Sequence, residues 1–459
     1  MHEINHPDRL FPVNGDQRKL ARNLYETIKD LPIISPHGHT DPTWFHTNQN
    51  FANATSLLLT PDHYLLRMFY SQGIDLETMG RGLDSDSQAM ELAWKTFASH
   101  LHLFWGTPSW IWLNHVFSEV FGLKEELNGE NAMNFYHEIN RQLGTDEFKP
   151  NALLERFNIE LIATTDDAID ELHQHTHKKV IPTFRPDRLT DPEHEDFASH
   201  METLSVQTGE NVSLVKGYLN ALKMRREFFK TKGTTATDHG HATAWTLNLS
   251  ENQLQALLDK ALKSSLTPSE AEQFRAAMLV EMAKMSLDDG LVMQIHPGSH
   301  RNHNHYLFQK FGRDVGADIP QSTEYTHALK DLLNTVGNEK DMKLIIFTLD
   351  ESRYSSELAP LAGHYPALKL GPAWWFHDSF EGMMRFRERT METAGFYNTV
   401  GFNDDTRAFF SIPARHDVAR RVDCHFISKL VLEHRLTEKA AFKLIQDLTY
   451  HLPKKAYNL

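Results

Sequence analysis

Short apolar segments that alternate with helical patterns constrain the fold of this chain more than any other feature of its sequence. Runs of this length, separated by helices, are typical of buried parallel strands. They occur at residues 33–39, 158–165, 179–184, 234–238, 290–295, 343–349, 367–370 and 397–402. This is the number of strands that a (β/α)8 TIM-type barrel requires, so we expect an α/β barrel fold. A doubly wound open sheet is the alternative, but it normally begins with a glycine-rich turn, and Ser35-Pro36-His37-Gly38 is not one.

The helical patterns predict an insertion into this barrel. Residues 43–150 contain helix-period segments rich in tryptophan and no comparable parallel-strand run, which predicts a mostly helical insertion after the first strand, covering the barrel mouth. Helices are also expected at 166–177 and after the capping box that begins at Thr267. The barrel domain is then expected to consist of two parts of the chain, residues 1–42 and 151–459.

Composition and charge exclude several functional classes. The chain has 459 residues, of which 40% are apolar and 24% charged, which is ordinary for a globular enzyme. Its formal charge of −14 argues against binding of nucleic acid, which requires a basic surface. The single cysteine, Cys424, cannot form an internal disulfide and fits a reducing compartment. Since there is neither an apolar leader at the N-terminus nor a run of about 18 apolar residues, we expect a cytoplasmic protein without membrane contact.

Polar and ionisable residues gather at the carboxyl ends of the predicted strands, where barrel enzymes carry their catalytic groups. An acid at such a position can simply cap the next helix, as we expect of Asp166 or Asp167. So many strand ends with polar groups require a further explanation, because ionisable groups are costly to bury unpaired. The later strands are followed by Arg185 and Asp187, Asp238 and His239, His296, Asp350, Trp374 and Trp375, and Asp404, Asp405 and Arg407.

Two histidines at the end of the first strand predict a metal site. Alternate residues of a strand point to the same face, so His37 and His39 point the same way. Strands 1 and 8 are neighbours in a closed barrel, so a carboxylate from Asp404 or Asp405 would join them. Two imidazoles and one carboxylate leave coordination positions open, which is typical of a catalytic zinc site. We therefore expect one divalent metal ion, Zn²⁺.

The strand-end residues resemble those of the uronate isomerases (glucuronate isomerase family) within the amidohydrolase superfamily. Matching motifs occur in the family's order from residue 37 to residue 416. They are His37-Gly38-His39, Asp62-His63-Tyr64 with Arg67, Thr164-Thr165-Asp166-Asp167, Arg185-Pro186-Asp187, Asp238-His239-Gly240, the set Gln294, His296, Gly298, Arg301 and Asn302, then Trp374-Trp375-Phe376, Asp405-Thr406-Arg407 and Arg415-His416. The chain departs from the family at Ser35, where an acid is frequent, and at Asp404, where the family often has threonine.

The resemblance implies roles for individual residues. His37, His39 and Asp405 are expected to hold the metal, with Asp404 as the alternative third ligand. Catalytic roles are implied for Asp405, Tyr64, Arg407 and His296. Substrate binding is implied for Arg185, Arg301, Asp238, His239, Trp375, His63 and Arg67.

The implied reaction is the interconversion of D-glucuronate with D-fructuronate and of D-galacturonate with D-tagaturonate, by proton transfer between C2 and C1 at a mononuclear divalent-metal site. This chemistry needs a base near C2, stabilisation of an enediolate oxygen and a clamp for the substrate carboxylate. Tyr64 could donate a proton or orient the sugar, and either Asp405 or a metal-bound hydroxide could be the base. The partner is then a hexuronate substrate, and a homo-oligomer is compatible with the sequence.

Two other functional classes are open to a chain of this kind. One is a metal-dependent hydrolase of the same superfamily that acts on a small anionic substrate. It would usually carry further metal-binding histidines at the middle strands, whereas the sixth strand here ends in Asp350. The other is a sugar-acid binder without catalysis, against which the intact residues His37, His39 and Asp405 argue.

Three arginines are candidates for binding the substrate carboxylate. The acidic chain would repel an anion at long range unless cations were concentrated at the site. Arg185, Arg301 and Arg407 follow different strand ends, and guanidinium groups suit bidentate carboxylate binding. We expect that not all three pair with acids, and that Arg301, which has no acid adjacent in sequence, faces the substrate first.

Overall fold

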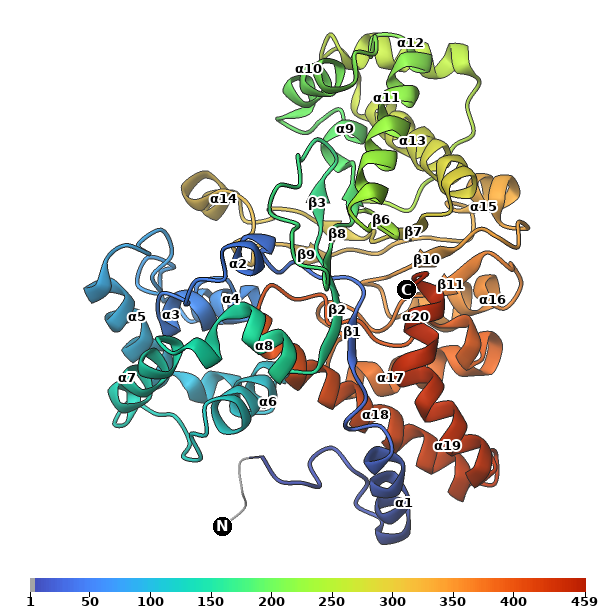
Figure 1. Ribbon diagram of the computed structural model, residues 1–459. Helices are drawn as coiled ribbons and strands as arrows, with labels where there is room; N and C mark the ends of the chain where they lie inside the picture. The colour runs from blue at the N-terminus through green and yellow to red at the C-terminus, as the bar shows by residue number, and fades with distance from the viewer. Residues whose placement is uncertain (1–4) are drawn as a thin grey trace.

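A curved parallel sheet forms the centre of the computed structural model, which describes residues 5–459 (Figure 1). Its strands form two hydrogen-bonded ladders, one in the order β1-β2-β4 and the other in the order β3-β5-β6-β7-β10-β11. The two ladders are joined because β3 continues the second predicted strand after β2, and β5 continues the third after β4. Pro182 has no N–H and separates β4 from β5, while backbone bonds from Thr164 to Ile181 and from Asp166 to Thr183 keep the segments paired. The strands are β1 (Ile33–Ser35), β2 (Ile159–Ala163), β3 (Asp166–Asp167), β4 (Val180–Ile181), β5 (Phe184–Arg185), β6 (Ala236–His239), β7 (Val292–Ile295), β10 (Leu344–Ile346) and β11 (Leu368–Leu370).

The first seven predicted strands are confirmed, but the eighth is wrong, and the strand ladder does not close. Residues 396–398 form a 3₁₀ turn, and Thr399 makes only an isolated bridge to Leu370. The gap to β1 is crossed by the bond from the His39 N–H to the Thr406 carbonyl, at 3.1 Å. The backbone explains the difference: Gly401 has a φ of 81°, which lies outside the extended range of a strand, and Pro453 and Leu448 lie so close that a side chain at this position would clash with them. Pairing with β11 is therefore limited to the bridge and to the bond from the Val400 N–H to the Leu370 carbonyl at 3.2 Å.

Helices cover the sheet on its outer side. The helix expected at 166–177 does not form, because this stretch continues the second strand as β3 and then turns. The helix after Thr267 is confirmed as α13, with both capping-box bonds and proline in its first turn. The helices of the barrel part are α1 (Gly15–Glu26), α9 (Asp187–Thr190), α10 (Phe197–Thr208), α11 (Val215–Thr231), α12 (Glu251–Ala261), α13 (Pro268–Asp289), α14 (His305–Phe311), α15 (Lys330–Val336), α16 (Ala359–Ala362), α17 (Phe380–Ala394), α18 (Ile412–Leu432), α19 (Glu438–Gln446) and α20 (Leu452–Ala456).

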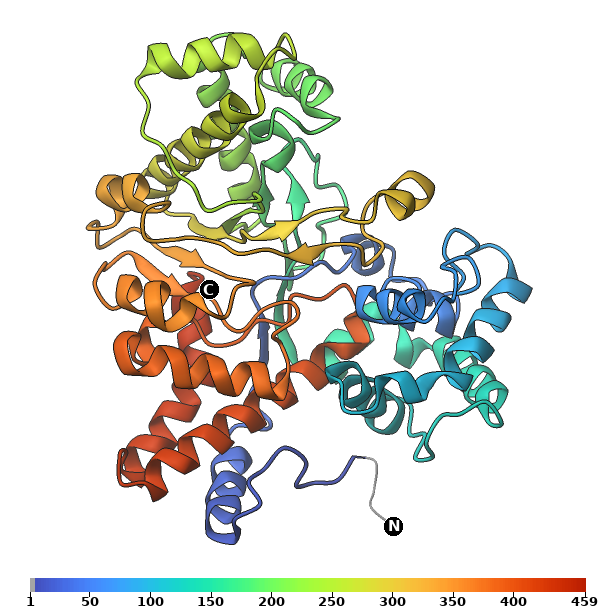
Figure 2. The same cartoon turned by 180° about the vertical axis from the view of Figure 1, so that it is seen from behind.

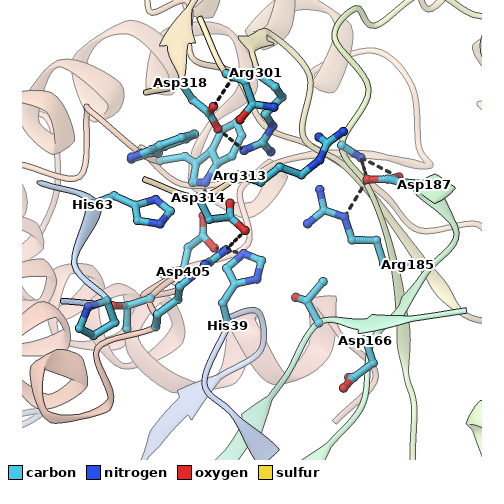
Figure 3. Close-up of a pocket in the computed structure, with 18 of the residues that line it drawn as sticks. His39, His63, Asp166, Arg185, Asp187, Arg301, Arg313, Asp314, Asp318 and Asp405 are labelled. Carbon is cyan, nitrogen blue, oxygen red and sulfur yellow. Dashed lines mark hydrogen bonds and ion pairs between the residues drawn. The ribbon is translucent and has the colours of Figure 1, made fainter. Parts of the chain in front are cut away.

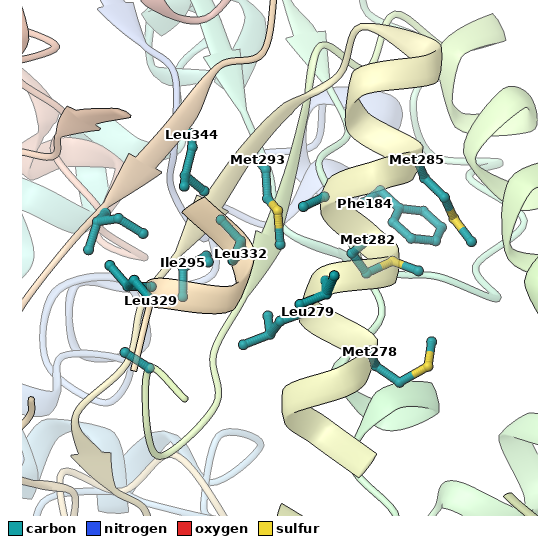
Figure 4. Packing of buried hydrophobic residues seen from close by; sticks show 14 of the residues in the cluster. Phe184, Met278, Leu279, Met282, Met285, Met293, Ile295, Leu329, Leu332 and Leu344 are labelled. Atoms are coloured by element: carbon teal, nitrogen blue, oxygen red, sulfur yellow. The ribbon is translucent and has the colours of Figure 1, made fainter. Parts of the chain in front are cut away.

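The main core lies between the sheet and these helices. Figure 4 shows methionine and leucine side chains of α13 packed beside β7 and α15. Met278 and Met282 are fully buried, as are Met293 and Ile295 of β7. Burial of a side chain of this size contributes about 1.5–3 kcal/mol, so this layer fixes the strands against their helices. Within residues 5–459, no helix combines the length and apolar character needed to cross a lipid bilayer.

The residues after β1 form a helical lobe beside the sheet. Figures 1 and 2 show it on one side of the molecule, in blue to teal. It has its own aromatic-rich core, which meets the barrel part at Phe409 and Phe410; the Phe410 ring stacks on Phe121 at 5.5 Å. Its helices are α2 (Pro42–Thr47), α3 (Ala54–Leu58), α4 (His63–Ser71), α5 (Ser87–Ser99), α6 (Pro108–His115), α7 (Ala132–Leu143) and α8 (Pro150–Arg156).

Candidate active site

A polar cavity of about 430 Å³ opens at the carboxyl ends of the strands (Figure 3). The helical lobe contributes to it through the start of α4, and a loop between α14 and the short strand β9 (Ile319–Pro320) contributes from the other side. The lining residues include His39, His63, Tyr64, Asp166, Asp187, Arg185, Arg301, Arg313, Asp314, Asp318, Trp374, Trp375, Asp405, Arg407 and Arg415. The cavity therefore combines acids with an unusual number of guanidinium groups.

His37, His39 and Asp405 converge at this cavity. The Nε2 atoms of His37 and His39 lie 3.3 and 3.0 Å from Asp405 Oδ1. His37 and His39 directly follow β1, while Asp405 has a φ of 40°, a left-handed conformation that is unusual for a residue other than glycine. The Trp374 indole N–H donates to Asp405 Oδ2 and holds this carboxylate. Of the two candidate acids, the structure turns Asp405 toward the histidines, whereas Asp404 Oδ2 accepts from His416 Nε2 at 3.0 Å.

The chemistry of these three residues fits a divalent metal. Asp405 Oδ1, which the Nε2 atoms of both histidines face, is buried and has no hydrogen-bond partner of good geometry within residues 5–459. Burial alone would raise the pKa of Asp405, but His37 and His39 hold it well below its usual range. Burial lowers the pKa of His39, which favours the neutral imidazole that binds a metal. An ionised carboxylate and imidazole nitrogens that face one point are the donors that zinc prefers.

A second group of ionisable residues lies beneath this set. His296 Nδ1 lies 2.6 Å from Asp238 Oδ1, and the His296 ring stacks on His37 with centroids 4.5 Å apart. The other oxygen of Asp238 is 3.3 Å from Arg185 Nη1. Burial would raise the pKa of Asp238, but His296 and Arg185 keep it well below its usual value. Asp238 and His296 therefore support the floor of the site and do not line the open cavity.

Each of the three candidate arginines pairs with an acid, so the expectation that they would not all do so is wrong. Arg185 Nε donates to Asp187 Oδ2 at 2.7 Å. Arg301 Nη1 donates to Asp318 Oδ2, also at 2.7 Å. Arg407 Nη2 lies 3.2 Å from Asp314 Oδ2. The last two partners, Asp318 and Asp314, lie in the loop between α14 and β9, distant in sequence from the strand ends.

Tyr64 reaches the cavity from α4 and is held by a hydrogen-bond network. Its hydroxyl donates to Asp378 Oδ1 at 2.6 Å and accepts from the Phe376 N–H at 2.8 Å. Arg415 Nη1 donates to the other oxygen of Asp378 at 2.8 Å, and its guanidinium lies 3.6 Å above the Trp112 ring. Burial and the nearby Asp378 carboxylate raise the pKa of Tyr64 well above its ordinary value. The phenol is therefore protonated and fixed in place.

The remaining predicted residues are placed in different ways. His63 lines the cavity, its Nε2 is buried without a partner in the described part of the chain, and burial together with Arg407 lowers its pKa to about 4. Trp375 forms part of the wall. His239 turns away from the cavity and its Nε2 lies 3.1 Å from Thr237 Oγ1. Arg67 also stays outside the lining, with its guanidinium 4.4 Å above the Phe376 ring.

Several lining residues were not anticipated from the sequence. Asp314, Asp318 and Arg313 lie in a loop between two short elements, where no strand end or known pattern marked them. Asp378, which holds Tyr64 but is not itself a lining residue, was not anticipated either; it lies four residues after Trp374, and this position after the seventh strand is the signal that could have identified it.

Comparison with known proteins gives matches over the whole chain. A sequence model of the family described as glucuronate isomerase matches residues 14–457. The uronate isomerase of Xanthomonas euvesicatoria is 57% identical over 464 residues, covering 99% of this chain and 98% of that protein. The uronate isomerase of Phenylobacterium zucineum is also 57% identical, covering 99% of this chain and 96% of the relative.

Solved structures agree with these sequence matches. The crystal structure of glucuronate isomerase from Caulobacter crescentus has a TM-score of 0.96 at 56% identity, covering 99% of this chain and 96% of that one. The uronate isomerase of Thermotoga maritima has a TM-score of 0.91 at 27% identity, with 98% of both chains covered. A structure described as a metal-dependent hydrolase from Lactobacillus casei has a TM-score of 0.53 at 12% identity, covering 95% of this chain and 97% of that one, and shares the fold alone.

Proposed function

The chain belongs to the glucuronate isomerase family and is a uronate isomerase, and from this premise we propose that it interconverts D-glucuronate with D-fructuronate and D-galacturonate with D-tagaturonate. The observation that carries the proposal is the convergence of His37, His39 and Asp405 at a cavity whose lining includes the three candidate arginines. The first set suits a divalent metal, and the second suits a carboxylate. A sugar acid brings both kinds of group together in one small molecule.

His37, His39 and Asp405 are the residues that would hold the metal, which we propose is Zn²⁺. When bound, such an ion supplies Lewis acidity that polarises the carbonyl of the substrate and its neighbouring hydroxyl. The chain itself keeps the ligands in place: Trp374 holds one oxygen of Asp405, and the His39 N–H is bonded to the Thr406 carbonyl. These contacts link the end of strand 1 to the segment after residue 399.

The isomerisation moves a proton from C2 to C1, so a group at the cavity must accept it and return it. We propose that a carboxylate oxygen of Asp405 carries this proton, because Asp405 is ionised and lines the cavity. Tyr64 is suited to orient the sugar, since its own proton is directed to Asp378. His296, hydrogen-bonded to Asp238, would keep the His37 ring in its orientation by stacking.

The substrate carboxylate is proposed to bind among the arginines of the cavity. Arg185 is almost completely committed to Asp187 and Asp238, whereas Arg301 and Arg407 are about one-third exposed. Trp375 provides a flat apolar wall beside Arg301, whose guanidinium lies 5.7 Å from that ring. Arg301 and Arg407 are therefore the cations that a bound hexuronate would reach most easily.

The test compares acidic with neutral sugars. We expect kcat/KM for D-glucuronate and D-galacturonate to exceed that for D-glucose and D-xylose by several orders of magnitude, with metal measured in the same preparation. Arg301→Met and Arg407→Met should each lower kcat/KM on the uronates by roughly 30- to 1000-fold, because each removes a charge-assisted bond worth about 2–4 kcal/mol in the transition state. Comparable wild-type rates on the neutral sugars would contradict the sugar-acid assignment.

A further inference from the structure

Asp314 is a carboxylate of the cavity that pairs with Arg407, one of the three candidate arginines. It lies in the loop between α14 and β9, and its Oδ2 is 3.2 Å from Arg407 Nη2. Figure 3 shows Asp314 reaching in among the other labelled residues of the cavity. A carboxylate in this place resembles, in charge and in shape, the group that we propose the substrate carries.

The ion pair of Asp314 differs from the other two arginine pairs of the cavity. Asp187 also accepts from the Gly240 N–H, and Asp318 also accepts from the Asn302 N–H at 2.7 Å, so both acids are anchored to the backbone. For Asp314, the contact with Arg407 is the one ion pair found in the described part of the chain. The Asp314 and Arg407 side chains are 43% and 39% exposed. An exposed pair of this kind is weak and is easily exchanged for another partner.

The surroundings of Asp314 define an anion position. Burial would raise the pKa of Asp314, but Arg407, His63 and Arg301 lower it far below the ordinary value for an aspartate. Groups that stabilise this carboxylate would stabilise any other carboxylate at the same place. Two carboxylates cannot share the position without repulsion, so an incoming anion has to displace the first.

We propose that Asp314 determines substrate affinity by occupying, in the ligand-free enzyme, the Arg407 guanidinium that a bound substrate carboxylate takes over. The proposal rests on the sugar-acid substrate proposed above. A hexuronate supplies its own carboxylate and can replace Asp314, whereas a neutral sugar leaves the Asp314–Arg407 pair in place and gains nothing from it. Asp314 therefore lowers the affinity for acidic ligands, which have to displace it, and leaves the affinity for neutral ligands unchanged.

The test is the affinity of Asp314→Asn. This variant keeps the shape of the side chain and removes its charge, so Arg407 is left free for the substrate. We expect KM for D-glucuronate to fall about two- to tenfold, the range set by an exposed ion pair together with the lost charge repulsion. Asp314→Glu keeps the competing charge and should keep KM near that of the wild type.

The matched control is Glu77→Gln. Glu77 pairs with Lys310, four residues before Asp314, with Lys310 Nζ 3.1 Å from Glu77 Oε1, and neither residue lines the cavity. This variant removes a carboxylate charge beside the same loop without freeing a cation of the cavity, so KM should not change. An equal fall of KM in this control would show that loosening of the loop or net charge is responsible, and would overturn the proposal, as would an unchanged or raised KM in Asp314→Asn.

Binding without turnover separates this proposal from the proposed function. D-Gluconate is an open-chain sugar acid that lacks the carbonyl needed for isomerisation, and D-glucitol is its neutral counterpart. We expect Asp314→Asn to bind D-gluconate more tightly than wild type by the same factor, measured by calorimetry, with D-glucitol unaffected. A wild type inactive on uronates would refute the proposed function alone, whereas unchanged D-gluconate affinity in the variant would refute the role of Asp314 alone.

Discussion

Replacing Asp378 by asparagine tests how the tyrosine of the cavity is held. The two oxygens of Asp378 accept from the Tyr64 hydroxyl at 2.6 Å and from Arg415 Nη1 at 2.8 Å. Asparagine keeps the shape of the side chain but removes its charge. Its amide N–H₂ group cannot accept a hydrogen bond, so either the Tyr64 hydroxyl or Arg415 Nη1 loses its acceptor. Arg415 is 4% exposed, so water cannot replace the lost partner.

The size of the effect follows from these contacts. Removing one partner of a buried ion pair costs about 3–5 kcal/mol, because the other charge is left buried. Arg415 keeps a bond to Ser411 Oγ at 3.0 Å and its contact with the Trp112 ring, so we expect about 2–4 kcal/mol. For a chain of this length the entropy of unfolding is about 1 kcal/mol per degree, so Tm should fall by about 2–4 °C.

The assay combines thermal unfolding with steady-state kinetics of Asp378→Asn, Tyr64→Phe and the double variant. Loss of a hydrogen bond to a charged group should lower kcat about 10- to 100-fold in Asp378→Asn, because Tyr64 loses its fixed position. If Asp378 acts through Tyr64, the double variant has the kcat of Tyr64→Phe. A further fall of kcat in the double variant would refute this reasoning.

Asp423→Asn provides the control for stability. Asp423 forms a similarly buried, bidentate pair with Arg387, at 2.7 and 2.8 Å, between α17 and α18 and outside the cavity lining. Its loss should lower Tm by a similar amount and leave kcat unchanged. If Tm fell in Asp423→Asn but not in Asp378→Asn, the loss of the Asp378 charge would not leave Arg415 as an uncompensated buried charge.

Three further outcomes are expected. Asp405→Asn should lose bound metal and turnover together while the far-UV circular dichroism spectrum stays unchanged; an active variant that retains metal would contradict both proposed roles. Burial raises the pKa of Asp417, but its two arginine partners outweigh this effect and lower the pKa below the ordinary value. The contribution of Asp417 to stability is therefore complete above the unfolded pKa near 4 and is lost as the pH falls below it. The Tm difference between wild type and Asp417→Asn should therefore be largest at pH 7 and shrink below about pH 4; a constant difference would refute the linkage. Gly401→Ala should lower Tm by about 2–4 °C, because a φ of 81° is unfavourable for alanine and the new Cβ would lie 2.5 Å from Pro453 Cγ. Calorimetry of the purified variant would measure this fall of Tm.

Local sequence determined most of the strands and helices. Seven of the eight predicted strands form, because short apolar runs between helices have few other ways to bury themselves in a chain of this size. The capping box at Thr267 starts α13 as expected, since its two bonds involve only residues of the first turn. His37 and His39 also follow β1 as predicted, which needs no more than the alternation of a strand.

The family motifs indicated the reaction, because residues that share a chemical task keep their order along the chain. That order identified Asp405 as the third residue facing His37 and His39, although Asp404 lies beside it. The final choice between the two acids depends on backbone conformation. Asp405 adopts a φ of 40°, which is uncommon for a residue other than glycine, and its carboxylate accepts from the Trp374 indole N–H, a contact that no local pattern predicts.

Only the tertiary structure decided how the polar side chains are paired. Arg407 meets Asp314 and Tyr64 meets Asp378, across separations that no local pattern encodes. The same holds for the eighth strand, which is limited to a bridge with Leu370 and ends at Gly401, where φ is 81° and Pro453 and Leu448 lie close to the backbone. Strand and helix propensities are short-range properties, whereas an ion pair or a close backbone contact depends on where the whole chain brings two distant residues. For this reason the sequence by itself identified the two histidines, the carboxylate and the three candidate arginines, and the fold determined which acids pair with them.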